Sequence, residues 1–272
     1  MRHIDEDTIT QAVIARHAAA GDARLREVMT SLVQHLHAFA RDVKLTEAEW
    51  VEGVRFLSDC GRAGAQGRPE LALLSDTLGL TALVTAVNRR KPRGCTEATV
   101  PEPLVVDGGP VGGAAGRGEP CYVRGRVQAL DGTPITGAEV RVGPADGERQ
   151  AALLCTDAEG GFVYRTTVAT PQPIAHGGPA GRLLHALGRH PWRPAHLHFT
   201  ISSPGYERLV TQVFRQGDPY LDSDAVFGVR SSLVTDWVRQ EPGRTPDGHT
   251  SAVPFTTLDF SFVLNATPGD KP

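Results

Sequence analysis

Two histidines separated by one residue, His196 and His198, are the first residues of the chain whose type and spacing could do chemistry. Residues two apart on a β-strand project to the same face, while Leu197 and Phe199 would project to the other. The apolar face is expected to lie in a core, so the imidazoles face a cavity or solvent. Two neighbouring imidazoles are half of a metal site, or they are simply polar residues on an exposed strand. Spacing alone leaves both interpretations open.

The elements that would position this pair are of two kinds. Between about residues 22 and 100, apolar side chains recur every three or four residues, as from Leu25 to Val43, and Thr46–Glu49 has the spacing of a capping box. A glycine-rich stretch at 101–120 indicates an irregular connection. After this stretch, apolar and polar residues alternate in short segments separated by Gly and Pro turns, which is typical of β-strands. We therefore expect a mainly β fold with an α-helical N-terminal region, residues 1–105, followed by a β-sandwich, residues 106–272.

Composition excludes several classes of partner. The 272 residues carry a net charge of −3, which gives no electrostatic reason to bind nucleic acid or an anionic membrane. No apolar run approaches the ~20 residues that span a bilayer. The four cysteines are widely spaced, without a CxxC pair, and no signal-peptide pattern precedes them. We expect a cytoplasmic protein with free thiols.

Longer motifs surround the histidine pair. They are GRHPWRPAHLHF at 188–199, SPGY at 203–206, VTQVF at 210–214 and GDPYLDSDAVFG at 217–228, with LTEAEW at 45–50, LLSDTLG at 73–79 and CTEATV at 95–100 nearer the N-terminus. Together they resemble the intradiol ring-cleavage dioxygenases of the hydroxyquinol and catechol 1,2-dioxygenase type, over nearly the whole chain. The resemblance implies the sandwich fold, an aromatic small-molecule substrate, and a homodimer formed through the N-terminal helices.

The resemblance also implies a ferric ion held by two histidines and two tyrosines, and only the histidines match, at His196 and His198. Arg149 stands at the place of one tyrosine and Gln172 at the place of the other. A hard trivalent ion is stabilised by anionic oxygen ligands. A guanidinium there would cost ~4 kcal/mol per unit charge at ~4 Å, with an effective dielectric of about 20. We therefore expect no metal cofactor.

Other pocket positions of the family have counterparts in the chain. Arg193 matches an arginine near the substrate, and Gln212 matches a glutamine near the metal. We expect the substrate to be lined by Ala82, Thr85, Val100, Pro103, Leu104, Gln172, Val226 and Phe227. Glu102 replaces a leucine–glycine pattern and adds a carboxylate. Thr85 stands where hydroxyquinol enzymes often have an acidic residue, and Ala82 stands where they have a larger apolar one.

These residues suggest a repurposed enzyme. Glu102, Arg149, Arg193, His196, His198 and Gln212 offer groups for general acid–base catalysis without a metal. We expect a condensation or cyclisation of an aromatic substrate, for example of the Pictet–Spengler type.

Two alternatives remain open. The first is an iron-dependent hydroxyquinol or catechol 1,2-dioxygenase with altered ligands, in which His196, His198 and Glu102 form a two-histidine, one-carboxylate set. The second is a non-catalytic protein that binds an aromatic ligand.

Overall fold

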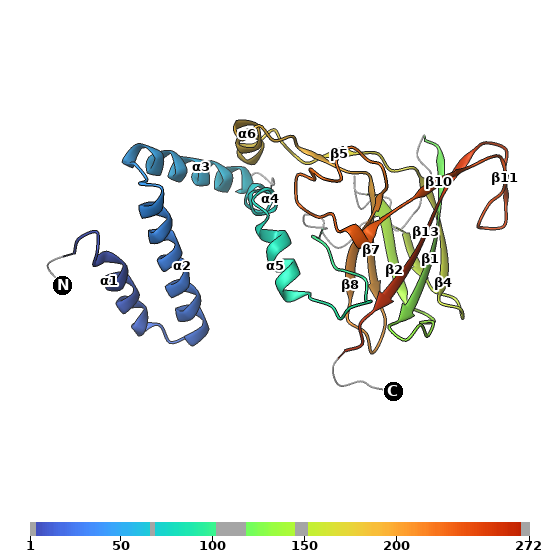
Figure 1. Cartoon of the computed structure of the whole chain (residues 1–272), viewed down its shortest axis with the longest axis horizontal. Coiled ribbons are helices and arrows are strands. Elements are labelled where there is room, and N and C mark those ends of the chain that lie inside the picture. The colour runs from blue at the N-terminus through green and yellow to red at the C-terminus, as the bar shows by residue number, and fades with distance from the viewer. Residues whose placement is uncertain (1–3, 66–68, 102–117, 145–151, 268–272) are drawn as a thin grey trace. The chain divides into compact units, whose positions relative to one another are not determined.

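The computed structural model describes residues 4–65, 69–101, 118–144 and 152–267, and the chain divides into two compact units, residues 1–59 and 60–272. The expected division between residues 105 and 106 stays a prediction. Figure 1 shows the helices at the N-terminal end of the chain and the strands in its second unit.

The first unit is helical, as the apolar periodicity predicts. It holds α1 (Ile9–Arg16), the short 3-10 helix η1 (His17–Ala19), α2 (Ala23–Asp42) and most of α3 (Glu47–Ala65). Asp22 caps α2 by accepting hydrogen bonds from the backbone amides of Arg24 and Leu25. The predicted capping box is confirmed, because the Glu49 carboxylate accepts from the Thr46 amide at 2.9 Å and the Thr46 hydroxyl from the Glu49 amide at 3.3 Å.

The second unit begins with the end of α3 and two further helices, α4 (Glu70–Thr77) and α5 (Leu80–Asn88). Its strands form two main sheets. The first has the order β10 (Trp237–Gln240), β13 (Phe255–Leu264), β1 (Pro120–Ala129) and β4 (Gly161–Thr167). The second has the order β3 (Ala152–Cys155), β2 (Glu139–Pro144), β7 (His196–Ser202), β8 (Leu209–Arg215) and β9 (Val234–Thr235).

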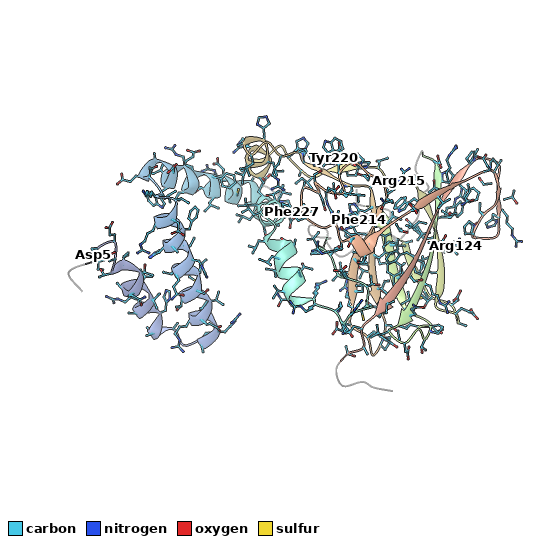
Figure 2. The ribbon with its side chains drawn as sticks, viewed as in Figure 1. Asp5, Arg124, Phe214, Arg215, Tyr220 and Phe227 are labelled. Carbon is cyan, nitrogen blue, oxygen red and sulfur yellow. The ribbon has the colours of Figure 1, made fainter. Side chains whose placement is uncertain are left out.

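The two sheets share one apolar core. Phe199 from β7 meets Phe262 from β13 with their ring centroids 4.7 Å apart, and both are fully buried. Gly125 on β1 is a site of close packing, because a Cβ atom there would lie 1.9 Å from the ring of Phe162. Arg124 lies on the same strand (Figure 2). It donates to Asp259 of β13 at 2.7 Å, and this carboxylate raises the pKa of the guanidinium. The mainly β sandwich with an α-helical N-terminus is therefore confirmed.

Smaller elements lie outside the main sheets. They are β5 (Gln172–Pro173) paired with β6 (Trp192–Arg193), α6 (Pro179–Ala186), the 3-10 helix η3 (Ser231–Leu233), and β11 (Gly243–Arg244) paired with β12 (Thr250–Ser251). Among the described residues no single helix is long and apolar enough to cross a bilayer, although α4 and α5 meet that test together as a pair bent by 75°.

Candidate functional site

Strand β7 places the two histidines as their spacing predicts. Leu197, Phe199 and Ile201 are fully buried in the core between the sheets, so His196 and His198 project from the opposite face. Their ring centroids are 5.5 Å apart. His196 is 1 % exposed and His198 is half-buried. The interpretation as polar residues on a solvent-exposed strand therefore does not hold for His196.

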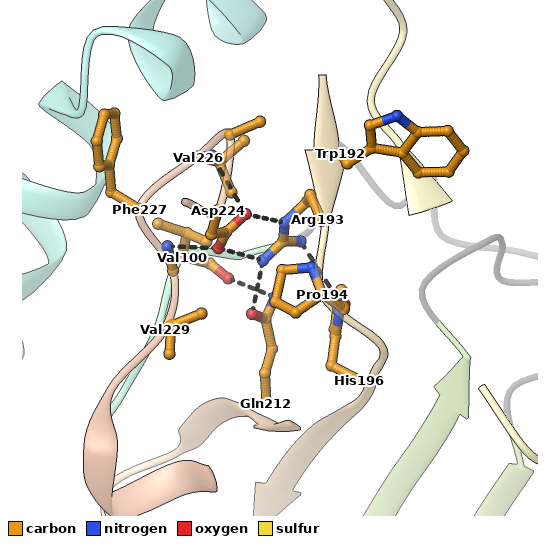
Figure 3. A network of polar contacts seen from close by, with 12 residues as sticks. Val100, Trp192, Arg193, Pro194, His196, Gln212, Asp224, Val226, Phe227 and Val229 are labelled. Atoms are coloured by element: carbon orange, nitrogen blue, oxygen red, sulfur yellow. Dashed lines mark hydrogen bonds and ion pairs between the residues drawn. The ribbon is translucent and has the colours of Figure 1, made fainter. Parts of the chain in front are cut away.

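A buried polar network surrounds His196 (Figure 3). Nη1 of Arg193 lies 3.3 Å from Nε2 of His196, and Nη2 of Arg193 donates to Oε1 of Gln212 at 2.9 Å. The Asp224 carboxylate accepts from Nε of Arg193 at 3.1 Å. Arg193, Gln212 and Asp224 are at most 6 % exposed. Burial of the guanidinium is compensated by its ion pair with Asp224 and by its hydrogen bonds.

The network fixes the tautomers of both histidines. Arginine only donates, so Nε2 of His196 accepts, while its Nδ1 donates to the Pro194 carbonyl at 2.7 Å. Gln212 lies directly opposite His198 in the β7–β8 register, and its amide nitrogen is 2.6 Å from Nε2 of His198. Because the Gln212 oxygen already accepts from Arg193, the amide nitrogen donates to His198. In each imidazole the lone pair of Nε2 therefore accepts a hydrogen bond, which a metal ion bound at that nitrogen would replace.

Asp224 holds Arg193 from a loop that follows β8. Its carboxylate also accepts from the backbone amides of Gly228 at 2.8 Å and Val226 at 3.3 Å. A Cβ atom on Gly228 would lie 2.8 Å from Nη2 of Arg193, so this loop approaches the guanidinium too closely for a side chain. The sequence reasoning missed Asp224, although it lies inside the quoted motif at 217–228.

A cavity of about 590 Å³ opens in front of His196 and Arg193. Its walls come from α4, the segment before residue 102, β5 with the turn after it, and Val226. They are Pro69, Glu70, Leu73, Asp76, Val100, Pro101, Gln172–Gly178, Arg193, His196 and Val226. Most of the lining is apolar, with polar groups at a few places, as in sites that hold a small molecule.

The structure separates the expected substrate residues into three groups. Val100, Gln172 and Val226 line the cavity. Ala82 packs behind it on Val100 and Val226, and Thr85 is buried in α5, so neither contacts the cavity. Phe227 lies under the guanidinium of Arg189, 4.7 Å from its ring centroid, and is absent from the cavity wall. Glu102, Pro103, Leu104 and Arg149 lie outside the described residues.

Two carboxylates that the sequence reasoning did not consider line the cavity. Asp76, rather than Thr85, supplies an acidic side chain to this wall. Glu70 is 2 % exposed and accepts from the Ala180 amide at 3.0 Å, at the start of α6. The motif at 73–79 contains Asp76, so its spacing from Leu73, about one helical turn, could have indicated a shared face.

The four tyrosines of the chain all lie within the described residues. The contacts described for each of them are with residues other than His196 and His198. Tyr164 is buried in the core between the sheets, on the far side of β7, and burial raises the pKa of its phenol. Tyr122 meets Phe255 at 5.4 Å, and Tyr206 packs against the edge of the core. Tyr220 stacks on Trp192 with the ring centroids 5.7 Å apart. Trp192 points away from the Arg193 network (Figure 3).

These donors fit only half of the ferric site that the family resemblance implies. Two imidazoles are present in the correct tautomer, with the carbonyl of Pro194 orienting His196 as an outer-shell partner. A phenolate ligand is missing from the described residues around them, and at one of its two places the chain has Gln172. Gln172 lies opposite Arg193 in the β5–β6 register, and its side-chain amide donates to the Thr170 hydroxyl at 3.0 Å.

Comparisons with known proteins agree with the fold and with the motifs. Residues 22–96 match a family model described as the catechol dioxygenase N terminus, and residues 112–266 match one described as dioxygenase. The chain is 49% identical to a 6-chlorohydroxyquinol 1,2-dioxygenase of Cupriavidus pinatubonensis, over 98% of this chain and 100% of the relative. It is 42% identical to a hydroxyquinol 1,2-dioxygenase of Nocardioides simplex, over 95% of each.

Solved structures give the same result. A hydroxyquinol 1,2-dioxygenase from Pseudomonas putida superimposes with a TM-score of 0.89 at 38% identity, covering 96% of this chain and 99% of the other. A catechol 1,2-dioxygenase from Pseudomonas arvilla gives 0.81 at 26% identity, over 98% and 94%.

These relatives correct two expectations. The expected metal-independent condensation or cyclisation is wrong, because proteins alike over their whole length are ring dioxygenases. The expectation of no cofactor is wrong for the same reason, and the comparisons support iron. The error arose because two substituted ligand positions were given more weight than the whole inherited cavity.

Proposed function

Since the chain belongs to the intradiol ring-cleavage dioxygenase family, we propose that it is an iron-dependent dioxygenase with altered ligands, which opens the ring of an ortho-dihydroxylated aromatic substrate of the hydroxyquinol class. The relatives that match over the whole chain carry that activity in their names. The single observation that carries the proposal is the buried network of Arg193, Gln212 and His196 at the end of an apolar cavity.

The chain's own residues bind and orient the ring. Val100, Ile174 and Val226 line the cavity with apolar surface, which excludes water from the ring. Arg193 provides a fixed guanidinium, whose donors attract the developing negative charge of a deprotonated hydroxyl. Asp224 and Gln212 hold that guanidinium in place, so it needs little reorganisation when the substrate binds.

The proposal is tested by oxygen uptake. Purified protein supplied with ferrous or ferric iron is given hydroxyquinol or catechol, and oxygen consumption is measured together with loss of the aromatic ultraviolet absorption. We expect one molecule of O2 to be consumed per ring opened, and we expect the His196→Ala variant to lose this activity. His190→Ala is the matched control, because His190 binds the Ser223 hydroxyl at 2.9 Å and does not line the cavity. Uptake no faster than that of iron in buffer would refute the proposal, and tight binding without turnover would favour the ligand-binding alternative.

The same family membership leads us to propose a homodimer formed through the N-terminal helices. One face of α2 carries exposed apolar side chains at helical spacing, Leu25, Val28, Leu32, Leu36 and Phe39. Leu32→Glu is expected to give a monomer by light scattering, whereas Arg26→Glu, on the charged part of the same helix, should leave the dimer intact. A wild-type monomer at micromolar concentration would refute this assembly.

A further inference from the structure

We infer that His196 and His198 hold a divalent transition-metal ion in a centre that has no phenolate ligand. This inference rests on the proposed function, because it concerns the iron that the reaction would use, and it departs from the ligand set that the family resemblance implies. It is carried by the donors that the chain places around β7.

The two imidazoles are prepared as ligands. Both project from one face of β7, and their ring centroids are 5.5 Å apart. Nε2 of each ring accepts a hydrogen bond, from Arg193 or from Gln212, and a metal ion bound there would replace that donor. The 2.7 Å hydrogen bond from Nδ1 of His196 to the Pro194 carbonyl holds the tautomer and the ring orientation. A histidine that binds a metal through one ring nitrogen usually donates the N–H of its other ring nitrogen to such a partner.

The tyrosines cannot supply the missing anionic donors. Tyr164 is on the other side of the β7 sheet, in the core, beside Cys121, and its pKa is raised by burial, which favours the neutral phenol. Tyr122 on β1 meets Phe255 of β13 and lies under Arg165 of β4, and Tyr220 stacks on Trp192. The fourth tyrosine of the chain, Tyr206, packs at the edge of the core. None of the four tyrosines therefore supplies a phenolate to the histidine pair.

Position 172 is the described position at which the chain differs from the ligand set that the family resemblance implies. Gln172 lines the cavity together with His196, and its backbone pairs with Arg193, two residues before the turn into β7. A carboxamide is a neutral donor, so it does not replace the charge of a phenolate. Position 172 is therefore the place at which one substitution could restore an anionic oxygen.

The charge around the histidines favours a divalent ion. Arg193 is paired with Asp224, so this buried pair adds no net negative charge. Glu70 and Asp76 line the cavity, yet among the described residues no three His, Cys, Asp or Glu side chains converge into a metal-holding group. Neutral imidazoles suit divalent iron, zinc, copper and nickel, whereas a trivalent ion needs anionic oxygen donors for its stabilisation.

The first experiment measures metal binding in the full chain. Anaerobic titration calorimetry with Fe(II), and with Co(II) and Zn(II) as non-redox probes, gives affinities, and visible spectroscopy follows the addition of ferric nitrilotriacetate. We expect one divalent ion per chain, weakened at least about tenfold in His196→Ala and in His198→Ala, and unchanged in His190→Ala. With Fe(III), we expect no phenolate-to-iron charge-transfer band.

The second experiment uses position 172 as a gain of function. Gln172→Tyr is expected to produce a visible charge-transfer band with Fe(III) and tyrosinate vibrations in the resonance Raman spectrum. Gln172→Phe, which has the same ring without the hydroxyl, should produce neither. Circular dichroism and a thermal melt establish that both variants are folded.

Each result has a definite meaning. A charge-transfer band in the wild-type protein, no divalent binding, or unchanged binding in the two histidine variants would overturn the inference. A folded Gln172→Tyr variant without the band would overturn the placement of residue 172 beside the histidines. These measurements need no substrate, so a protein that binds Fe(II) through both histidines but opens no ring refutes the proposed function alone.

Discussion

The two faces of β7 hold their neighbours in different ways. On one face, Leu197, Phe199 and Ile201 are fully buried and are held by shape against the other sheet. On the other face, His196 is equally buried but is held by hydrogen bonds to Arg193 and Pro194. The stability of the core face therefore depends on the packed volume of its side chains, while that of the cavity face depends on hydrogen bonds and ion pairs. The two faces should respond differently to substitution.

The largest effects are expected where each face is most buried. Phe199→Ala should lower the free energy of unfolding by about 3–5 kcal/mol, because it leaves a cavity between the sheets. Urea denaturation with two probes measures the loss. Phe199→Leu, which keeps most of the volume, serves as the control and should lose much less. A loss below about 1 kcal/mol for the alanine variant would show that the sheets do not depend on this ring.

On the cavity face, Arg193→Met is expected to cost about 3–5 kcal/mol, because the buried Asp224 carboxylate loses its cation. The double variant Arg193→Met, Asp224→Asn should recover part of that loss, since the uncompensated charge is gone. The same Asp224→Asn change should not rescue Phe199→Ala. Additive losses in the Arg193 and Asp224 pair would contradict the idea that pairing holds this face.

The core also contains a titratable group, the Cys121 thiol, whose pH dependence tests whether water is excluded from the core. Burial raises the pKa of the Cys121 thiol from 9.0 to about 12. Because the folded pKa lies above the unfolded one, the thiol's contribution is fully present below pH 9 and is lost as the pH rises toward 12. The slope contributed by this residue should be about 1.4 kcal/mol per pH unit, and Cys121→Ala should remove it. A slope unchanged by the substitution would assign the alkaline loss to other groups.

The smallest expected effects compare two glutamines of the cavity. Gln212 is fully buried and bonded to Arg193 and His198, so Gln212→Leu should cost about 1–3 kcal/mol. Gln172 is half-buried and its amide donates to the nearby Thr170 hydroxyl, so Gln172→Leu should change the free energy of unfolding by no more than about 0.5 kcal/mol. Chemical denaturation of the two variants measures the difference. Equal losses would remove the distinction between the buried Gln212 on β8 and the half-buried Gln172 on β5.

Sequence patterns were sufficient wherever the physical rule is local. The helical stripe of α2, the capping box at Thr46 and Glu49, and the alternation of β7 all follow from repeats of two to four residues. The motifs were also sufficient to recognise the family. They led to a wrong function because the two tyrosine positions were read without the surrounding cavity, which retains its apolar walls and its Arg193 network.

The assignment of Thr85 and Phe227 to the cavity shows where such reasoning stops. Both lie close in sequence to residues that do line it, Asp76 and Val226. The direction of a helix face or of a loop depends on what packs against it. Phe227 turns away because its backbone has a φ of 58° and its ring packs under Arg189, a contact that no local pattern encodes.

The sequence by itself determined that two histidines share a strand face and that the chain has only four tyrosines, because alternation and residue identity are properties of neighbours along the chain. The tertiary structure alone decided that Gln172 pairs with Arg193, that Asp224 holds that guanidinium, and that Asp76 reaches the cavity. These contacts join segments from about 20 to about 120 residues apart, and only the closing of the sandwich brings them together.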